Sequence, residues 1–243
     1  MLTPPEIARS LLAAGESKAR LPFGKMLLLA ILAGAYIALA GVGATAAAVT
    51  VESGSLAKLV SACIFPAGLT MVLLAGSELF TGNCLMVMAL LERRITPAQL
   101  LRNWLTVYLG NAVGGAAVAA LAVYSHTASL FGDGLARSMV SIAESKAALG
   151  AGDAFLRGVL CNFLVCLAVW MAAASKRAEG KVIALFFPIL LFVLCGYEHC
   201  IANLYYLPAG AFAAAEYGME TTLTLAGCLK NLAAVTLGNL VGG

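Results

Sequence analysis

The chain alternates between long apolar stretches and short polar ones. The apolar stretches occupy about 26–50, 59–91, 103–124, 154–174, 182–214 and 221–243. Continuous apolar runs of this length are typical of helices that cross a bilayer, because about 20 apolar residues span its hydrocarbon core. The pattern therefore predicts an all-α integral membrane protein with six transmembrane segments.

Two of these segments are too long for a single straight helix. Segments 59–91 and 182–214 each hold 33 residues. As straight helices they would measure about 50 Å, against a hydrocarbon core of about 30 Å. We therefore expect both to be broken. Gly76 and Gly196 supply flexible positions for the breaks, and Pro66 and Pro188 precede them where a helix would be kinked or started.

The two halves of the chain carry matching motifs. GSELFTGN at 76–83 and GYEHCIAN at 196–203 share Gly, Glu and Asn at the same spacing, and RNWLTVYLGNAVGG at 102–115 matches KNLAAVTLGNLVGG at 230–243. A duplication of three segments places the second copy in the opposite orientation, because three is odd. We expect an inverted repeat, with one copy at about 26–124 and the other at about 154–243, in a channel domain over 26–243. Residues 1–25 are expected to form an amphipathic helix at the membrane interface.

The basic residues indicate how the chain is oriented. The amino-terminal stretch and the second and fourth loops carry ten of the 15 Lys and Arg residues, and the other side carries five. Because cytoplasmic loops are enriched in Lys and Arg, both termini are predicted to be cytoplasmic.

Composition agrees with a membrane protein and narrows the function. Hydrophobic residues make up 62% of the chain and charged residues 11%, with a mean hydropathy of +0.95. The net charge of +3 is small and dispersed, which gives no argument for a nucleic-acid partner. All seven cysteines fall in apolar segments without a CxxC pair, so we expect a packing role and no disulfide framework, zinc site or other cofactor.

The candidate chemistry lies at the two breaks. Interrupted helices expose backbone N–H groups at membrane depth. We interpret Glu78 and Glu198 as structural residues that hold the broken helix by accepting hydrogen bonds from these groups or from the repeated Asn. His199 has no counterpart in the first copy, where Leu79 stands. An ionisable residue inside the membrane is a functional hypothesis by default, with a hydrogen-bonded core histidine as the alternative.

At these residues the chain resembles a known family. AGSELFTGN, RGVLCNFLVCLAVWMA at 157–172 and GKVIALFFPILLFVLCGYEHCIANLYYLP at 180–208 are similar to the formate/nitrite transporter family, which includes hydrosulfide channels. The similarity runs from about residue 5 to 243. It implies an aquaporin-like protomer in the cytoplasmic membrane, assembled as a homopentamer in the lipid bilayer, with one pore for small monovalent anions in each protomer.

The resemblance also implies roles for individual residues. The central pore histidine corresponds to His199, the loop threonine to Thr81 and the vestibule lysine to Lys146; the alternative for Lys146 is an exposed loop cation. Asn162 matches a polar position near the pore. Asn203, the second-copy member of the repeated Asn, is also assigned to the pore. The hydrophobic constrictions would involve five further residues: Phe65, Leu69, Leu79, Phe80 and Phe192. From their spacing alone, the three phenylalanines would be interpreted as core packing.

These positions suggest a mechanism. A bare anion in an apolar slit loses its hydration at a large energetic cost, which protonation to the neutral acid removes. A vestibule cation would concentrate anions, and His199 is the deeper group that titrates near neutral pH. We therefore expect protons, as well as the anion, to take part.

Two other classes of protein fit the sequence less well. A membrane enzyme would need three convergent ligands or a nucleophile with a base, and no HExxH, GxSxG or Gly-rich phosphate loop occurs. An aquaporin-type channel for small neutral solutes fits the broken segments but lacks paired NPA tripeptides. The prediction is a transport protein and not an enzyme.

Overall fold

The computed structural model describes all 243 residues and is entirely helical. The helices follow one another through α1 Pro4–Ala19, α2 Phe23–Ala48, α3 Gly54–Ile64, α4 Pro66–Ala75, α5 Phe80–Asn83, η1 Cys84–Met86, α6 Val87–Leu91, α7 Pro97–Tyr124, η2 Thr127–Ser129, α8 Gly134–Ala148, α9 Ala151–Ala173, α10 Ala178–Leu194, α11 Cys200–Glu216 and α12 Leu225–Gly242.

Five helical stretches are long and apolar enough to cross a bilayer by themselves. They are α2, α3 with α4, α7, α9 and α12. The predicted fifth segment is divided between α10 and α11, each of 17 residues. Large apolar side chains face outward along these helices, for example Leu105, Leu121 and Phe163, which are between 62% and 68% exposed. An apolar exterior of this kind suits a protein whose surroundings are lipid or further copies of itself.

Both overlong segments are interrupted at the expected glycines. Gly76 ends α4 with φ of +78°, and Gly196 follows α10 with φ of +70°. A Cβ at either position would meet no atom within 4 Å, so the backbone conformation rather than space favours glycine. Pro66 starts α4 at its first turn, whereas Pro188 lies inside α10. The chain then crosses the interior without helical structure before α5 and α11 begin.

Two pairs of helices pack backbone against backbone. A Cβ at Gly114 of α7 would lie 2.0 Å from the carbonyl oxygen of Ile31 in α2, and a Cβ at Gly242 of α12 would lie 2.0 Å from that of Val159 in α9. Only glycine permits such a close approach. The α2–α7 and α9–α12 pairs are therefore held together in the same way.

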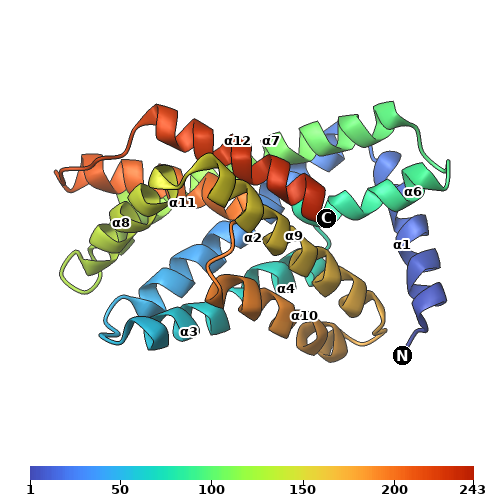
Figure 1. The fold of residues 1–243 in the computed structure, drawn as a ribbon, viewed down its shortest axis with the longest axis horizontal. Coiled ribbons are helices and arrows are strands. Elements are labelled where there is room, and N and C mark those ends of the chain that lie inside the picture. The colour runs from blue at the N-terminus through green and yellow to red at the C-terminus, as the bar shows by residue number, and fades with distance from the viewer.

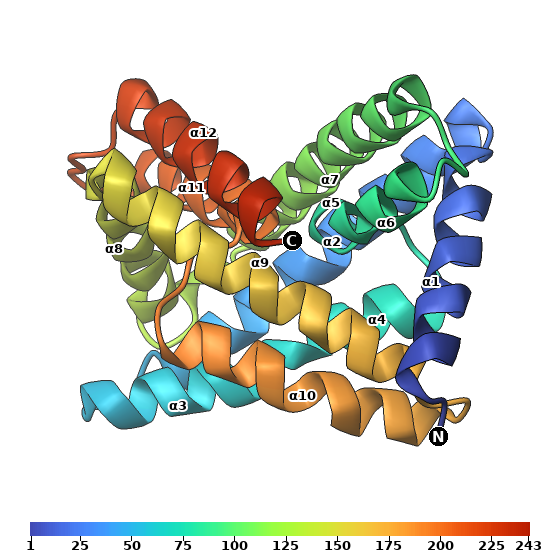
Figure 2. The same cartoon turned by 45° about the vertical axis from the view of Figure 1, so that its right-hand side comes forward.

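The arrangement in space has two distinct ends. In Figure 1, α1 lies at one end of the long axis and α8 at the other, with α2, α9 and the broken segments between them. Figure 2 shows α3 and α10 running together along one side, opposite the splayed pair of α7 and α12. We call these extremities the α1 end and the α8 end.

The structure adds one helix that the sequence pattern missed. The predicted segments assigned no element between 124 and 154, and α8 occupies Gly134–Ala148 within that range. Its apolar positions are separated by Ser, Glu, Lys and Arg, so it does not resemble a transmembrane helix. It packs with α11 by burying Ala136, Met139, Val140 and Ala143.

Candidate functional site

A histidine and a threonine from the two breaks meet in the interior. Thr81 lies in the first turn of α5, and His199 caps the amino end of α11. Thr81 Oγ1 is 3.0 Å from His199 Nε2, although the residues are 118 positions apart. Thr81 is fully buried and His199 is 3% exposed. The pair joins the two broken segments at the centre of the molecule.

The capping contact assigns the proton of the neutral imidazole. The backbone N–H of Ala202 donates to His199 Nδ1 at 3.0 Å. A backbone amide can only donate, so Nδ1 accepts and the proton of a neutral ring lies on Nε2. The Nε2–H group therefore points toward Thr81 as a hydrogen-bond donor.

An apolar chamber surrounds this donor. Its volume is about 10 Å³, and its lining consists of Ile37, Phe65, Leu69, Leu79, Val165, Ile189, Phe192 and His199. His199 is the only polar member. The rings of Phe65 and Phe192 meet edge to face at 5.7 Å, and Phe192 stacks on the His199 imidazole at 5.8 Å. A space of this size holds about one water molecule, so passage of a larger particle requires these rings to move.

Four of the five predicted constriction residues line the chamber, and Phe80 does not. The Phe80 ring packs edge to face against Trp104 and Tyr108, at 6.3 Å and 5.0 Å between ring centres. Phe80 follows Leu79 directly in the chain, and its side chain points away from the chamber as α5 begins. The structure thus brings Leu79 to the chamber and places Phe80 in the packing between α5 and α7.

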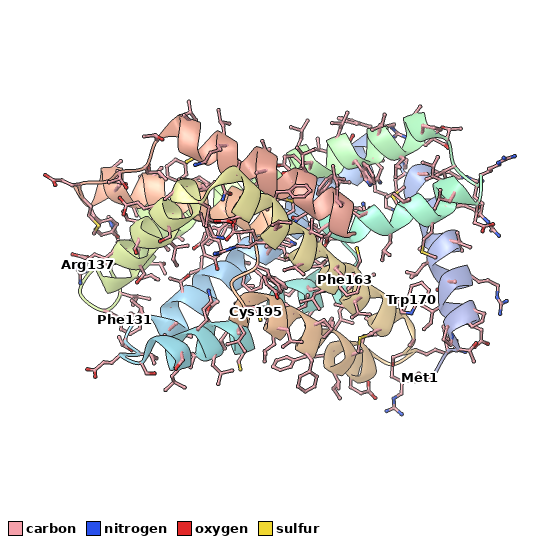
Figure 3. All side chains as sticks on the ribbon, in the orientation of Figure 1. Met1, Phe131, Arg137, Phe163, Trp170 and Cys195 are labelled. Carbon is pink, nitrogen blue, oxygen red and sulfur yellow. The ribbon has the colours of Figure 1, made fainter.

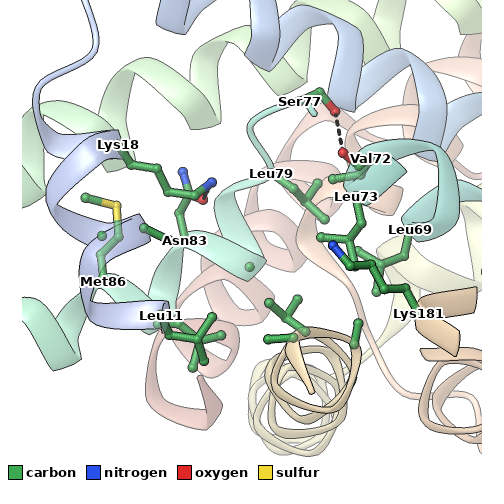
Figure 4. A pocket seen from close by; sticks show the side chains of 17 residues that line it. Leu11, Lys18, Leu69, Val72, Leu73, Ser77, Leu79, Asn83, Met86 and Lys181 are labelled. Carbon is green, nitrogen blue, oxygen red and sulfur yellow. Dashed lines mark hydrogen bonds between the residues drawn. The ribbon is translucent and has the colours of Figure 1, made fainter. Parts of the chain in front are cut away.

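A cavity opens on each side of the chamber. The cavity at the α1 end has a volume of about 200 Å³ and shares Leu69 and Leu79 with the chamber. In Figure 4, Lys18 and Lys181 approach it from opposite sides. The cavity at the α8 end has a volume of about 930 Å³ and shares Phe65, Phe192 and His199 with the chamber. The two cavities and the chamber thus lie in series, with the smallest volume at His199, and we call this series the route.

Lys146 lies on α8 and lines the wider cavity. Its ammonium group donates to both carboxylate oxygens of Glu198 at 2.9 and 3.0 Å and stands 5.4 Å from the centre of the Tyr206 ring. The Lys146 side chain is only 15% exposed. The alternative of an exposed loop cation therefore does not describe its position.

Lys18 holds the corresponding position at the other end. The Lys18 ammonium donates to Glu78 at 2.8 Å and to Asn83 at 2.9 Å. We did not single out Lys18 from the sequence, although it precedes Lys146 by 128 positions, the same offset that relates the LGN-x-VGG motifs. That offset is the signal that could have identified it.

The glutamates and asparagines at the breaks form two matching networks. Asn83 Nδ2 donates to Glu78 and Asn103, and Asn203 Nδ2 donates to Glu198 and Asn231, all at 2.7 to 2.9 Å. Asn203, which we assigned to the pore, thus braces the second carboxylate. One difference between the networks is that Asn83 Oδ1 accepts from Lys18 whereas Asn203 Oδ1 is buried without a partner.

Two further asparagines tie the broken ends to the neighbouring helices. Asn111 on α7 accepts from the Phe80 N–H and donates to the carbonyls of Glu78 and Ala30. Asn239 on α12 makes the equivalent contacts with the N–H of Cys200 and the carbonyls of Glu198 and Gly158. These side chains satisfy backbone groups that the interruptions leave unpaired.

Asn162 supports Thr81 instead of facing a cavity. Its Nδ2 donates to the carbonyl of Thr81 at 3.3 Å and to that of Asn239 at 2.7 Å, and its Oδ1 is buried without a partner. The Cys166 thiol donates to the same Thr81 carbonyl at 3.4 Å. No group of three or more His, Cys, Asp or Glu side chains converges to hold a metal ion.

Comparison with known proteins gives a consistent result. A family model described as formate/nitrite transporter matches residues 5–243. A probable formate transporter of Methanothermobacter thermautotrophicus is 38% identical, covering 99% of this chain and 92% of the relative. The formate channel FocA of Haemophilus influenzae is 39% identical, covering 88% of this chain and 80% of the relative.

Solved structures resemble the chain over most of its length. An ion channel of the FNT family superimposes with a TM-score of 0.87 at 32% identity, covering 98% of this chain and 94% of that one. A pentameric formate channel with formate bound superimposes with a TM-score of 0.80 at 32% identity, covering 90% and 92%.

Proposed function

The chain belongs to the formate/nitrite transporter family and is a multi-pass anion channel or transporter, not an enzyme; from this premise we propose that it passes small monovalent anions of the formate, nitrite or hydrosulfide class through a pore in each protomer. The observation that supports the proposal is that two cavities flank the chamber at His199 and share lining residues with it. The chamber volume favours substrates of a few atoms.

The proposed path of the anion follows the polarity of this route. An anion is attracted at either end by a lysine, Lys18 or Lys146, whose charge is balanced by a buried glutamate. In the chamber it meets apolar walls and the Nε2–H of His199. Charge there is costly, so we propose that the anion is protonated as it reaches His199 and crosses the narrow part as a neutral acid.

The hydrogen bonding of His199 sets a condition on this step. A second ring proton on Nδ1 would face the N–H of Ala202, donor against donor. We therefore propose that the proton arrives from the aqueous cavity together with the anion. The Nε2–H of His199 and the hydroxyl of Thr81 then hold the substrate by hydrogen bonds while the proton is exchanged.

The experiment that tests the function is a substrate panel in proteoliposomes. Formate, nitrite, hydrosulfide, acetate and lactate fluxes are compared at pH 5.5 and pH 7.5, with glycerol and water as neutral solutes. We expect anion flux that increases at the lower pH, and little glycerol flux. Flux of glycerol or water without flux of any anion would favour the aquaporin-like alternative and contradict the proposal.

His199→Asn tests the part played by the imidazole. Asparagine keeps a similar size and a hydrogen-bonding edge but lacks the imidazole Nε2–H that is proposed to hold the substrate while it is protonated. We expect a changed pH profile and changed anion preference at normal expression, measured at matched protein incorporation. Identical pH profiles in the variant and the wild type would remove the proposed role in protonation, and loss of expression in His199→Phe with a silent Asn variant would indicate a structural hydrogen bond.

We also propose that the protein is a homopentamer whose protomers are aquaporin-like inverted repeats of three segments each. The matched Lys–Glu–Asn networks support the repeat. An exposed row on α7 at every fourth position supports lateral association: Leu101, Leu105, Leu109 and Val113. Native mass measurement in a mild detergent should give five chains, and a monomer mass under conditions that preserve transport would contradict the pentamer.

The orientation is a proposal as well. Both termini are expected on the cytoplasmic side of the cytoplasmic membrane, which would place the α1 end toward the cytoplasm. Protease or label access to the amino terminus in intact cells and in inverted vesicles distinguishes the two orientations.

A further inference from the structure

The cavity at the α8 end contains an unusual excess of positive charge. Four cationic side chains line it, contributed by α3, α8 and α9: Lys58, Arg137, Lys146 and Arg157. Its only carboxylate is Glu198. Arg137 and Phe131 mark the outer rim of this cavity, where α8 faces α2 and α3 (Figure 3). A low-dielectric wall around such a cluster focuses its field into the cavity.

Two of the four cations have no protein partner. Lys146 is held by Glu198, and the Arg137 guanidinium donates to the carbonyl of Gly132. The ammonium of Lys58 and the guanidinium of Arg157 take part in no ion pair and no hydrogen bond. Both groups are thus free to bind something that enters the cavity.

Lys58 and Arg157 line the same cavity from different helices. They belong to α3 and α9, and Lys58 lies within electrostatic reach of Lys146, Glu198 and Arg157. Glu198 is the one carboxylate among four cations and already pairs with Lys146, so an anion bound between Lys58 and Arg157 would lower the remaining repulsion. Hydroxyl groups of Ser61 and Ser141 line the same cavity and supply neutral donors.

The cavity at the α1 end does not offer the same setting. It is about 200 Å³ against about 930 Å³, and of its two cations, Lys18 is already bound to Glu78 and Asn83. The two ends of the route therefore differ in charge and in room, although the Lys–Glu–Asn networks beneath them match.

We propose that Lys58 and Arg157 form a separate anion-binding site in the wide cavity at the α8 end, selective for oxyanions and stronger for multivalent ones. Guanidinium and ammonium groups together suit carboxylate and phosphate oxygens, and the attraction grows with the charge of the ligand. A multivalent oxyanion is larger than the transported anions and carries more charge, which the apolar walls of the chamber oppose. It would occupy the site without crossing and would block the cavity from that end. If the Lys58–Arg157 site also binds the transported anion, that part of the inference rests on the proposed function.

Binding is tested on the purified protein in a neutral detergent, with pyrophosphate as the probe. Thermal unfolding is recorded against pyrophosphate concentration for the wild type, Lys58→Gln/Arg157→Gln and Lys58→Arg/Arg157→Lys. Lys25→Gln/Lys230→Gln serves as the matched control, because it removes the same charge from positions outside the cavities. We expect pyrophosphate to stabilise the wild type, the charge-conserving variant and the control, and the half-saturating concentration to rise about tenfold or more in the neutralised variant.

The salt dependence of the pyrophosphate response and the unfolding temperature without pyrophosphate check the proposal further. Added NaCl should weaken the wild-type response, because the charges lie in a wide hydrated cavity. The neutralised variant should unfold at or above the wild-type temperature without pyrophosphate, since neither side chain has a protein partner and their repulsion is removed. An equal pyrophosphate response in the wild type and the neutralised variant overturns the proposal.

Flux then tests the sidedness of the site. Pyrophosphate outside proteoliposomes of mixed orientation should inhibit formate uptake only in the fraction of protein whose α8 end faces outward. The neutralised variant should resist this inhibition and should need about three to ten times more formate for half-maximal uptake. Unchanged inhibition in that variant overturns the proposal. If the wild type binds pyrophosphate through Lys58 and Arg157 but passes no anion, the binding site stands and the proposed function fails.

Discussion

Lys18 and Lys146 make the same ion pair at opposite ends of the molecule. Lys18 binds Glu78 at 2.8 Å and Lys146 binds Glu198 at 2.9 Å. Each carboxylate lies one residue before the amino acid that enters the chamber, Leu79 or His199. The cations therefore fix the backbone at the narrowest part of the route while they line the cavities on its two sides.

Removing either lysine should destabilise the protein, because it leaves a buried carboxylate without its cation. We expect Lys146→Met to cost about 3 kcal/mol and Lys18→Met less, since the Lys146 side chain is 15% exposed and that of Lys18 is 30%. Thermal unfolding in detergent measures the difference. Lys146→Met/Glu198→Gln should recover part of the loss, and a double variant no more stable than Lys146→Met would show that the ion pair is not the cause.

Thr81→Val should impair transport more than Thr81→Ser. Valine has nearly the shape of threonine but leaves the His199 Nε2–H buried without its 3.0 Å partner, at a cost of about 1–3 kcal/mol. Serine keeps the hydroxyl. Formate flux and unfolding temperature are measured for both variants, and equal flux in Val and Ser variants would argue against any role for the Thr81 hydroxyl in the pore.

Gly114→Ala should disrupt the packing of α7 on α2. The new methyl group would lie 2.0 Å from the Ile31 carbonyl oxygen, which is backbone and cannot rotate away. We expect sharply reduced yield of folded protein by size-exclusion chromatography. Gly24→Ala is the control, because a Cβ there meets nothing within 4 Å and should leave the yield unchanged.

Glu144 should make the attachment of α8 sensitive to acid. The backbone N–H of Thr222 and the hydroxyls of Thr221 and Thr222 donate to its carboxylate, and they hold the Glu144 pKa below its ordinary value. A carboxyl group with a lowered pKa in the folded state contributes stability above its unfolded pKa and loses it as the pH falls through the folded value.

Glu144→Gln isolates this contribution. The variant should lose stability relative to the wild type at pH 7, and the difference should shrink as the pH falls below the ordinary carboxyl range. Unfolding temperatures of both proteins between pH 7 and pH 3 measure it. A difference that stays constant over this range would mean that ionisation of Glu144 does not matter.

The helices and their interruptions were accessible from the sequence because they depend on local properties. Apolar runs longer than about 17 residues mark helices that need a bilayer, and they predicted α2, α7 and α9 to within about six residues at each end. The breaks at Gly76 and Gly196 follow from glycine's tolerance of positive φ. The helix α8 was missed, because its mixed polar and apolar positions resemble a loop between membrane segments.

Tertiary structure decided which side chains meet. His199 was singled out because placing an ionisable residue in an apolar segment costs free energy. Its contact with Thr81 could not be predicted in this way, because it joins residues 118 positions apart. Local pattern also could not tell Leu79 from Phe80. Both are apolar neighbours at the start of α5, and only packing against Trp104 and Tyr108 turns Phe80 away from the chamber.

The amino-acid sequence by itself thus determined the all-helical membrane fold, the two interruptions and the motifs that repeat between the halves, because each depends on composition or on spacing along the chain. Only the tertiary structure decided that Lys18 and Lys146 take equivalent places, that Asn203 braces Glu198 and that Lys58 and Arg157 share one cavity. Such contacts depend on how helices far apart in the sequence pack, and on the few glycines that let their backbones touch.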